Sequence, residues 1–116
     1  MQENFVTSQQ EPIMVLVSCA NAEEAKKIAQ NLLDKRLVAC AQVGSQIDSM
    51  YRWEAQIETA QEVLLQLKTF RALWGELEKE ILSIHSYSVP EVLAVPILEI
   101  SHYYYVWMMK ELLSEK

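Results

Sequence analysis

Residues 49–69, SMYRWEAQIETAQEVLLQLKT, decide the fold of this chain. Side chains alternate along both halves of the stretch, and in the second half Val63 and Leu65 share one face. Period-two alternation predicts strands with one buried face. A short polar connection, residues 54–60, separates the halves, and two strands joined so closely pair antiparallel. We therefore expect a long hairpin that overhangs the domain and carries Trp53 at its tip.

Two aromatic side chains of this hairpin, Tyr51 and Trp53, would have no core of their own to enter. Exposed aromatic clusters mark interfaces more often than ligand sites. We expect Tyr51 and Trp53 to form a subunit interface, so the chain should associate with copies of itself. Stacking of a ligand on these rings is the alternative.

Composition limits the classes to which the chain can belong. Its 116 residues, 51% apolar and 22% charged, suffice for one domain with a single core. We expect a polar tail over residues 1–12 and a single domain over residues 13–116. The tail lacks the features of a secretion signal, and no apolar run approaches the roughly 20 residues of a membrane span, so we expect a cytoplasmic protein. A net charge of −6 argues against nucleic acid as a partner.

Apolar periodicity orders the rest of the chain. Continuous apolar runs predict strands over residues 13–19, 37–43 and 92–98, and residues 44–46 should form a bulge. Apolar stripes predict helices over residues 21–36, 72–84 and 101–113, the first capped by Asn21 and the last by Ser101. The order is β-α-β-β-α-β plus a terminal helix. This is the α+β, ferredoxin-like sandwich, with a long hairpin between its second and third strands and one bare sheet face.

Six runs in this order resemble one family. They are KRLVAC (35–40), YRWE (51–54), EVLL (62–65), KT (68–69), HSYSVPE (85–91) and YYVW (104–107). Together they resemble the CutA family, the divalent-cation tolerance proteins. The resemblance implies a tight homotrimer similar to the PII signalling proteins, with clefts between subunits, that binds or signals rather than catalyses.

The chain departs from the family pattern near the hairpin turn and the histidine loop. The pattern has Trp, Gly and Lys where this chain has Arg52, Ala55 and Gln56, and proline where it has Ser86. Glycine takes a positive φ most cheaply, so its loss at Ala55 could change the turn type. A further departure replaces Pro-Gly by residues 45–46. Loop geometry should therefore differ from the family pattern.

Three residues are candidate metal ligands: Cys19, His85 and Glu91. A thiolate suits soft ions such as Cu(I), although a small buried hydrophobe is the commoner role of such a cysteine. Imidazole is the commonest transition-metal ligand, but His85 has no second histidine beside it. We expect these three residues to converge on a weak site for copper or another divalent ion. Two nitrogen or sulfur ligands are too few for a structural site, which needs four, and folding should not require the ion because a chain of this length already has a sufficient core.

Lys68 and Tyr87 are candidate ligand-binding residues of the same cleft. Lys68 could pair with Glu91 or with an anion, or it could simply extend its amine into water along an apolar strand. Cys40, inside an apolar run, is expected to be part of the core.

Other proteins of this fold have functions that the sequence argues against. An RNA-recognition motif needs aromatic residues on its central strands and a basic surface, and neither is present. An acylphosphatase-like enzyme needs a glycine-rich phosphate loop, whereas only Gly44 and Gly75 occur. No nucleophile, base and orienting group fall together in the sequence. A trimeric metal-binding module remains as the leading interpretation, and a PII-like sensor of a small molecule or anion is the alternative.

Overall fold

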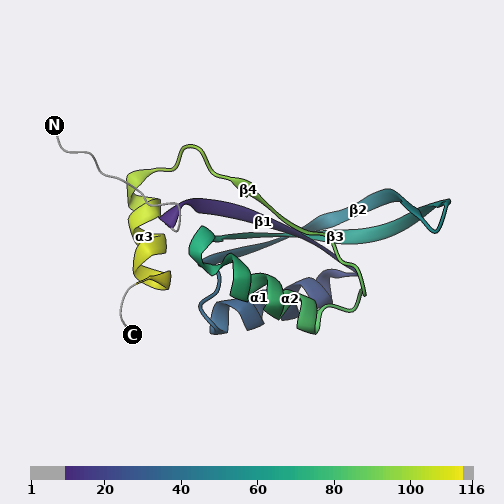
Figure 1. The fold of residues 1–116 in the computed structure, drawn as a ribbon, viewed down its shortest axis with the longest axis horizontal. Coiled ribbons are helices and arrows are strands. Elements are labelled where there is room, and N and C mark those ends of the chain that lie inside the picture. Colours follow the sequence, from purple (N-terminus) through teal and green to yellow (C-terminus); the bar gives the residue numbers. More distant parts are fainter. Residues whose placement is uncertain (1–9, 114–116) are drawn as a thin grey trace.

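The computed structural model describes residues 10–113 and shows an α+β sandwich (Figure 1). Four antiparallel strands lie in the order β2-β3-β1-β4, which is the predicted ferredoxin-like arrangement. The elements in chain order are β1 (Pro12–Cys19), α1 (Ala22–Asp34), β2 (Cys40–Trp53), β3 (Gln56–Phe70), the 3-10 turn η2 (Arg71–Leu73), α2 (Trp74–Ile84), β4 (Val92–Pro96) and α3 (His102–Leu112).

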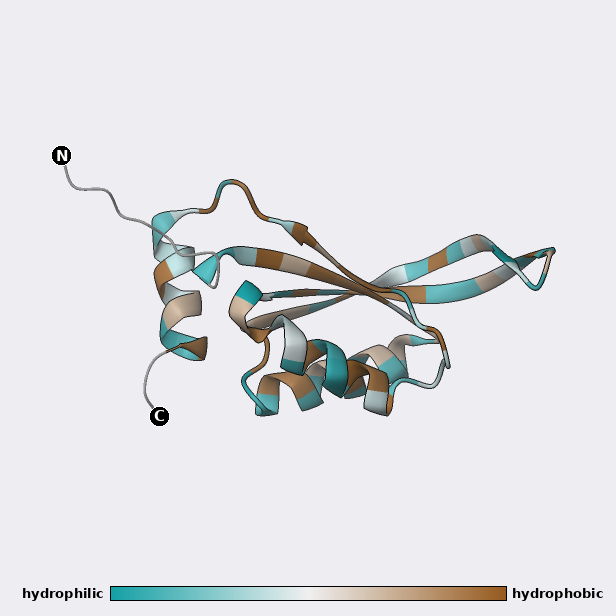
Figure 2. Cartoon of the chain, viewed as in Figure 1, coloured by the Kyte–Doolittle hydropathy of each residue, from teal (hydrophilic) through white to brown (hydrophobic). Residues whose placement is uncertain are grey.

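Helices α1 and α2 cover one face of the sheet (Figure 1). Along β1, Val15 and Val17 are fully buried under them, whereas the alternate residues Met14 and Leu16 remain partly exposed. The hydrophobic stripe of β1 is visible in Figure 2. Because strand side chains alternate between faces, the second face of the sheet carries apolar residues that neither α1 nor α2 covers. We call this second face the uncovered face.

Helix α1 begins and ends as capping chemistry dictates. The Asn21 side chain accepts the Glu24 amide at 2.8 Å. The helix ends at Asp34, two residues earlier than predicted, in a Schellman motif. Leu37 N–H bonds to the Leu32 carbonyl at 2.9 Å, and Arg36 takes a left-handed φ of 56°. Glycine usually occupies that position, so Arg36 is strained there.

The hairpin extends well beyond the helix layer, in a molecule measuring 56 × 28 × 24 Å (Figure 1). Its turn contains only Glu54 and Ala55, with φ of 49° and 66°, which is the pattern of a type I′ turn. The predicted polar connection over residues 54–60 is therefore wrong beyond Ala55, because Gln56 already pairs with Trp53. The predicted bulge is confirmed, as the register of β2 and β3 shifts between Val43 and Gln46.

Helix α3 packs at the end of the sheet farthest from the hairpin tip (Figure 1). There Phe70, Met108 and Leu112 form a second buried cluster, and the Tyr105 ring meets Phe70 edge-on at 5.6 Å. The cap by Ser101 is confirmed, since its hydroxyl accepts the Tyr104 amide at 3.3 Å. The terminal helix thus closes part of the second sheet face and leaves the rest uncovered.

Several predicted boundaries are wrong by a few residues. Strand β2 begins at Cys40 rather than at residue 37, and β4 ends at Pro96 rather than at residue 98. Cys40 is only half-buried, so its assignment to the core is also wrong. The predicted tail lies mostly outside the described residues. Of its described part, Glu11 pairs with Arg71 at 2.8 Å.

Candidate functional site

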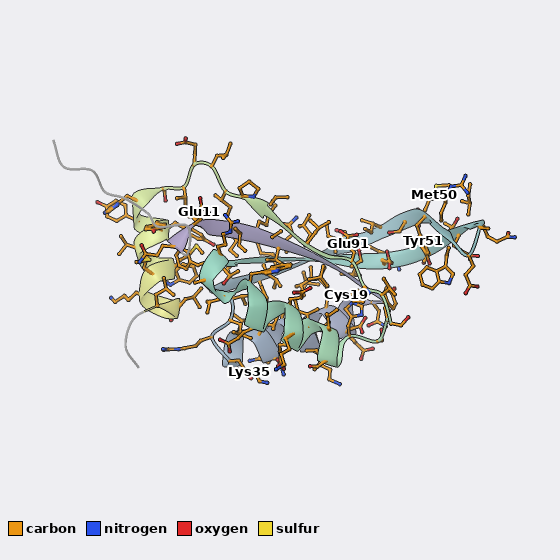
Figure 3. All side chains as sticks on the ribbon, viewed as in Figure 1. Glu11, Cys19, Lys35, Met50, Tyr51 and Glu91 are labelled. Atoms are coloured by element: carbon orange, nitrogen blue, oxygen red, sulfur yellow. The ribbon has the colours of Figure 1, made fainter. Side chains whose placement is uncertain are left out.

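Cys19, Glu24 and His85 meet at the end of β1 nearest the hairpin. Cys19 ends β1, Glu24 lies in the first turn of α1, and His85 directly follows α2. One ligand atom from each, the thiol sulfur, a carboxylate oxygen and a ring nitrogen, lie within 4.8 Å of one another. Figure 3 marks Cys19 on the helix side of the sheet. We call these three residues the Cys19 cluster.

Hydrogen bonds fix the orientation of the His85 ring. Its Nε2 lies 2.7 Å from the Ser18 carbonyl oxygen, which can only accept a hydrogen bond. Its Nδ1 accepts the Tyr87 backbone N–H at 3.0 Å. These two bonds assign the neutral tautomer with the proton on Nε2. The lone pair of the ring is therefore on Nδ1, which lies 3.8 Å from Glu24 Oε2.

The Glu24 carboxylate is held by backbone amides. Ala20 N–H donates to Oε1 and Ser86 N–H donates to Oε2, both at 2.8 Å. Burial by itself disfavours the charged form, but the hydrogen bonds from Ser86 and Ala20 outweigh it and lower the pKa of Glu24. An ionised oxygen ligand is thus present beside His85.

The thiol of Cys19 is fully buried and protonated. Burial first, and then the nearby carboxylates Glu24 and Glu62, raise the pKa of Cys19 to about 12. A thiol of that pKa is a poor nucleophile at neutral pH. Binding of an ion through its sulfur would have to release this proton.

Glu91, the third predicted ligand, does not join Cys19 and His85. It accepts a 2.8 Å hydrogen bond from the hydroxyl of Ser18, and Ser18 and Cys19 point to opposite faces of β1. The expected convergence is therefore wrong for Glu91, and the carboxylate beside Cys19 belongs to Glu24. Alternation along β1 separates Ser18 from Cys19, but no sequence signal places Glu91 beside Ser18.

Tyr87, predicted to line the cleft, lies beside the Cys19 cluster. Its hydroxyl donates to Glu62 Oε2 at 2.8 Å, and its ring centroid is 4.8 Å from that of His85. Burial and the hydrogen bond to Glu62 raise the pKa of Tyr87. Sequence reasoning missed Glu62, a buried carboxylate of β3.

Lys68 lies far from the Cys19 cluster. Lys68 on β3 pairs with Met14 on β1, and Met14 lies five residues before Cys19. Five residues of strand span roughly 16 Å. The ammonium of Lys68 donates to the side-chain oxygen of Gln42 on the uncovered face. Tyr51 and Trp53 are 44% and 45% exposed on the hairpin.

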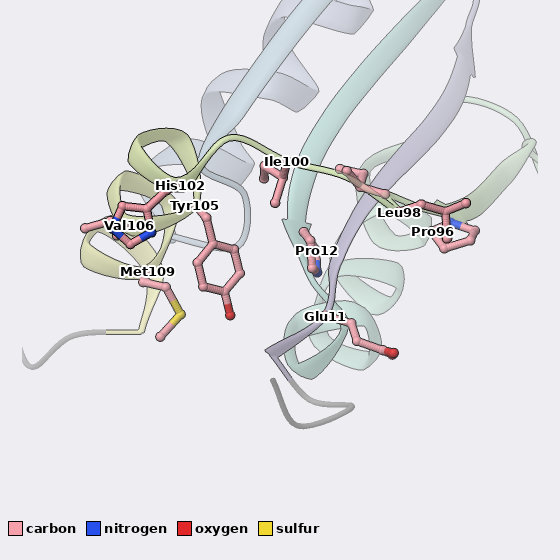
Figure 4. Close-up of a pocket in the computed structure, with 10 residues that line it drawn as sticks. Glu11, Pro12, Pro96, Leu98, Ile100, His102, Tyr105, Val106 and Met109 are labelled. Carbon is pink, nitrogen blue, oxygen red and sulfur yellow. The ribbon is translucent and has the colours of Figure 1, made fainter. Parts of the chain in front are cut away.

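A groove of about 800 Å³ opens between α3 and the segment after β4 (Figure 4). Its lining is mostly apolar, with Tyr105, Val106 and Met109 from α3. The carboxylate of Glu11, the imidazole of His102 and the phenol of Tyr105 are the ionisable groups among its lining residues. The groove offers apolar contacts rather than a set of ligands, so it is not the candidate site.

Comparison with known proteins gives the family. The model of the CutA1 divalent ion tolerance protein family matches residues 13–111. The chain belongs to this family. The divalent-cation tolerance protein CutA of Thermus thermophilus is 35% identical over 95 residues, 82% of this chain and 92% of that protein. Mouse protein CutA is 39% identical over 92 residues, but the match spans only 52% of its length.

Solved CutA structures share the fold. The CutA1 structure from Oryza sativa superimposes with a TM-score of 0.87 at 31% identity, covering 94% of this chain and all of that one. The periplasmic divalent cation tolerance protein CutA of Archaeoglobus fulgidus gives a TM-score of 0.84 at 31% identity, covering 87% and 98%. Among the described residues, no helix is long and apolar enough to cross a membrane.

The ligand atoms of the Cys19 cluster are of the types that bind a divalent or cuprous ion in the known classes of metal site. Sulfur, imidazole nitrogen and carboxylate oxygen are common ligands of Zn²⁺ and copper. The Nε2–H bond to the Ser18 carbonyl is the arrangement that orients ligating histidines in metal sites. Three ligands leave a coordination position open, so the site would be an exchangeable one. Glu24 was missed because it forms a cap in the sequence pattern, and only the tertiary fold brings it to His85.

Proposed function

We propose that this chain is a cytoplasmic, homotrimeric divalent-cation tolerance protein that binds copper or another divalent ion at Cys19, Glu24 and His85. The observation that carries the proposal is the approach of three different ligand atoms to within 4.8 Å of one another. The names of the matched family and of its Thermus relative agree with a role in divalent-ion tolerance. A protonated, enclosed thiol supports binding rather than catalysis as the role of this site.

Exposed apolar surface supports assembly into a homotrimer. Leu93 on β4 is 39% exposed, and the hairpin leaves Met50 and Ile57 74% and 65% exposed. Edge strands β2 and β4 also offer unpaired backbone groups. Copies of the chain that pack around the uncovered face would cover these surfaces. The two unpaired thiols, Cys19 and Cys40, agree with a reducing cytoplasm.

Ion titration tests the proposal. Cu(I) under reducing conditions, and Zn²⁺ separately, would be titrated against a competing chelator into wild type, Cys19→Ser and Glu24→Gln. We expect each substitution to weaken binding at least tenfold, since each removes one of three ligands. Cys40→Ser and Glu23→Gln are matched controls that keep the cluster and should bind as wild type does. Unchanged affinity in both cluster variants would contradict the site.

The pH dependence of binding provides a second test of the ligand set. Because the pKa of Cys19 lies far above neutral, each bound ion should displace one proton from its thiol. The apparent affinity should therefore rise about tenfold per pH unit between pH 6 and 8, roughly one proton per ion. Cys19→Ser should abolish most of this slope.

A sensor of a small anion is the second candidate, because of Lys68. Its ammonium bonds to the neutral Gln42, and among the described residues it forms no ion pair. A buried cation needs a counter-charge, so assembly over the uncovered face would favour an anion or a carboxylate there. Loss of anion binding in Lys68→Ala, with ion binding retained, would favour this candidate.

A further inference from the structure

We propose that the segment after His85 and the bound ion compete for the same ligand atoms, so that ion binding releases residues 86–91 from the Cys19 cluster. We call residues 86–91 the closing loop. This inference rests on the proposed ion-binding function and adds its regulation. The closing loop is the element that would report occupancy of the site to the rest of the molecule.

Two consecutive amides of the closing loop occupy the cluster. Ser86 N–H donates to Glu24 Oε2 at 2.8 Å, and Tyr87 N–H donates to His85 Nδ1 at 3.0 Å. Those two acceptor atoms are the pair that face each other at 3.8 Å. Two of the atoms that would bind the ion therefore already accept hydrogen bonds from the backbone of the closing loop.

The imidazole makes the competition strict. A ring nitrogen has a single in-plane lone pair, so His85 Nδ1 cannot accept the Tyr87 amide and bind an ion at once. The other ring nitrogen donates its proton to the Ser18 carbonyl and offers no alternative. A carboxylate oxygen has two lone pairs, so Glu24 could retain the Ser86 bond in part. Displacement of the Tyr87 amide is thus the minimum change on ion binding.

Packing of the cluster requires the same opening. The side chain of His85 is 0% exposed and that of Glu24 only 14%, and Cys19 is fully buried. Ligands of a tetrahedral ion with bonds of 2.0–2.3 Å lie roughly 3.3–3.8 Å apart, closer than the 4.8 Å limit of the cluster. An ion therefore needs a path inward to these enclosed ligands, and amides of the closing loop hold two of the ligand atoms.

Other contacts define how far the release can spread. At the start of the loop, the Tyr87 hydroxyl holds the buried Glu62 of β3 at 2.8 Å. At its end, Glu91 is fixed to Ser18 through both side chain and backbone. Displacement of Tyr87 would therefore free Glu62, which pairs with Ile47 beside the bulge of the hairpin. Occupancy would change the base of the hairpin while the loop stays tethered at Glu91.

Ser86→Pro removes one of the two competing amides, because proline has no N–H to donate to Glu24, and it leaves the Tyr87 amide in place. His85 already has ψ of 143°, within the range that a residue before proline prefers, so the change suits the backbone on that side. We expect it to tighten ion binding about tenfold, as loss of one competing hydrogen bond to a charged group allows. Ser86→Ala keeps the amide and removes only the side-chain hydrogen bond to Glu24, so it should give a smaller gain.

Tyr87→Phe is a second variant that tests the loop without altering the backbone. It removes the bond to Glu62 and should also tighten binding, by a few fold, because the closed loop loses one anchor. Tyr103→Phe, on the exposed surface of α3, is the matched control and should leave affinity unchanged. Circular dichroism of each variant would verify folding.

The decisive experiment measures hydrogen exchange of residues 86–91 with and without saturating Zn²⁺ or Cu(I), beside the affinities. We expect exchange at Tyr87 to quicken when the ion binds, and Ser86→Pro to bind more tightly. If the ion binds through the cluster while exchange at Tyr87 stays the same or slows, the competition is refuted and the ion-binding function stands. If neither wild type nor Ser86→Pro binds an ion, the proposed function fails, and the inference fails with it.

Discussion

At the scale of single residues, three non-glycine residues occupy left-handed backbone in turns that the fold requires. Arg36 (φ 56°) ends α1, and Glu54 (φ 49°) and Ala55 (φ 66°) form the hairpin turn. Left-handed backbone costs an ordinary L-residue roughly 1–2 kcal/mol. Glycine avoids this cost, but it also raises the conformational entropy of the unfolded chain, which offsets part of the gain in stability. Arg36→Gly and Ala55→Gly should each raise the free energy of unfolding by about 0.5–1 kcal/mol in urea titrations.

A glycine in α2, Gly75, offers a control for these substitutions. Gly75 has open space around an added Cβ and no positive φ. Gly75→Ala should therefore stabilise the helix by about 1 kcal/mol through propensity alone. If Arg36→Gly instead destabilised the protein, the side chain of Arg36 would have to contribute contacts that outweigh its backbone strain.

Tyr104 links stability to alkaline pH at a single side chain. Burial, and then a hydrogen bond with Cys40, raise the pKa of Tyr104 from 10.0 to about 12. The folded state thus keeps the phenol neutral where the unfolded state ionises it. Its stabilising contribution is complete below pH 10 and is lost as the pH rises towards 12. Tyr104→Phe should flatten the fall in unfolding free energy above pH 10, whereas Tyr103→Phe should not.

At the scale of elements, periodicity predicted the strands and helices because each buries one face. It failed where burial does not follow secondary structure. Residues 37 and 38 are apolar and buried, yet they lie in the turn after α1 rather than in β2. Gln56, Glu58 and Thr59 are polar because both faces of the hairpin are exposed within one chain, and polar residues this close together predict a loop rather than a strand. Alternation alone could not place the turn.

The candidate site was predictable only in part, for a related reason. Cys19 and His85 could be chosen by residue type, because thiol and imidazole are common transition-metal ligands and the chain has only two cysteines and two histidines. Glu24 could not, since its sequence context is that of a helix cap and its approach to His85 depends on the packing of α1 against α2. The amides that hydrogen-bond to the ligand atoms of Glu24 and His85 belong to the backbone, so no residue type in the sequence indicates them.

The bulge of β2 is an element whose geometry depends on one glycine. An added Cβ at Gly44 would lie 3.0 Å from the carbonyl oxygen of Leu64, which is backbone and cannot turn aside. Gly44→Ala should therefore distort the β2–β3 register and lower the unfolding free energy by roughly 1–3 kcal/mol. Thermal melts compared with Gly75→Ala would measure it. A neutral effect would mean that the bulge can move past Leu64 without loss.

At the scale of the whole molecule, packing within a single copy of the chain does not account for the exposed apolar side chains of the hairpin. Trp53 is 45% exposed, and the sheet below it leaves an apolar face uncovered. Burial of such surfaces against two further copies is the basis of the proposed homotrimer. Sedimentation equilibrium at micromolar concentration should give about three times the 13.4 kDa of the chain.

Trp53→Ala should weaken that assembly by roughly 2 kcal/mol or more, the usual cost of truncating a central aromatic at an interface. Leu82→Ala is its control, since Leu82 is 49% exposed on α2, in the helix layer on the opposite side from the uncovered face. A dilution series followed by sedimentation would separate the two variants. Replacement of residues 50–57 by an Asn-Gly turn should abolish assembly and keep helical circular dichroism, because those residues are exposed and lie outside the core. A wild type that sediments as a monomer would contradict the interface assigned to Tyr51 and Trp53, and the exposed hairpin would then need another partner.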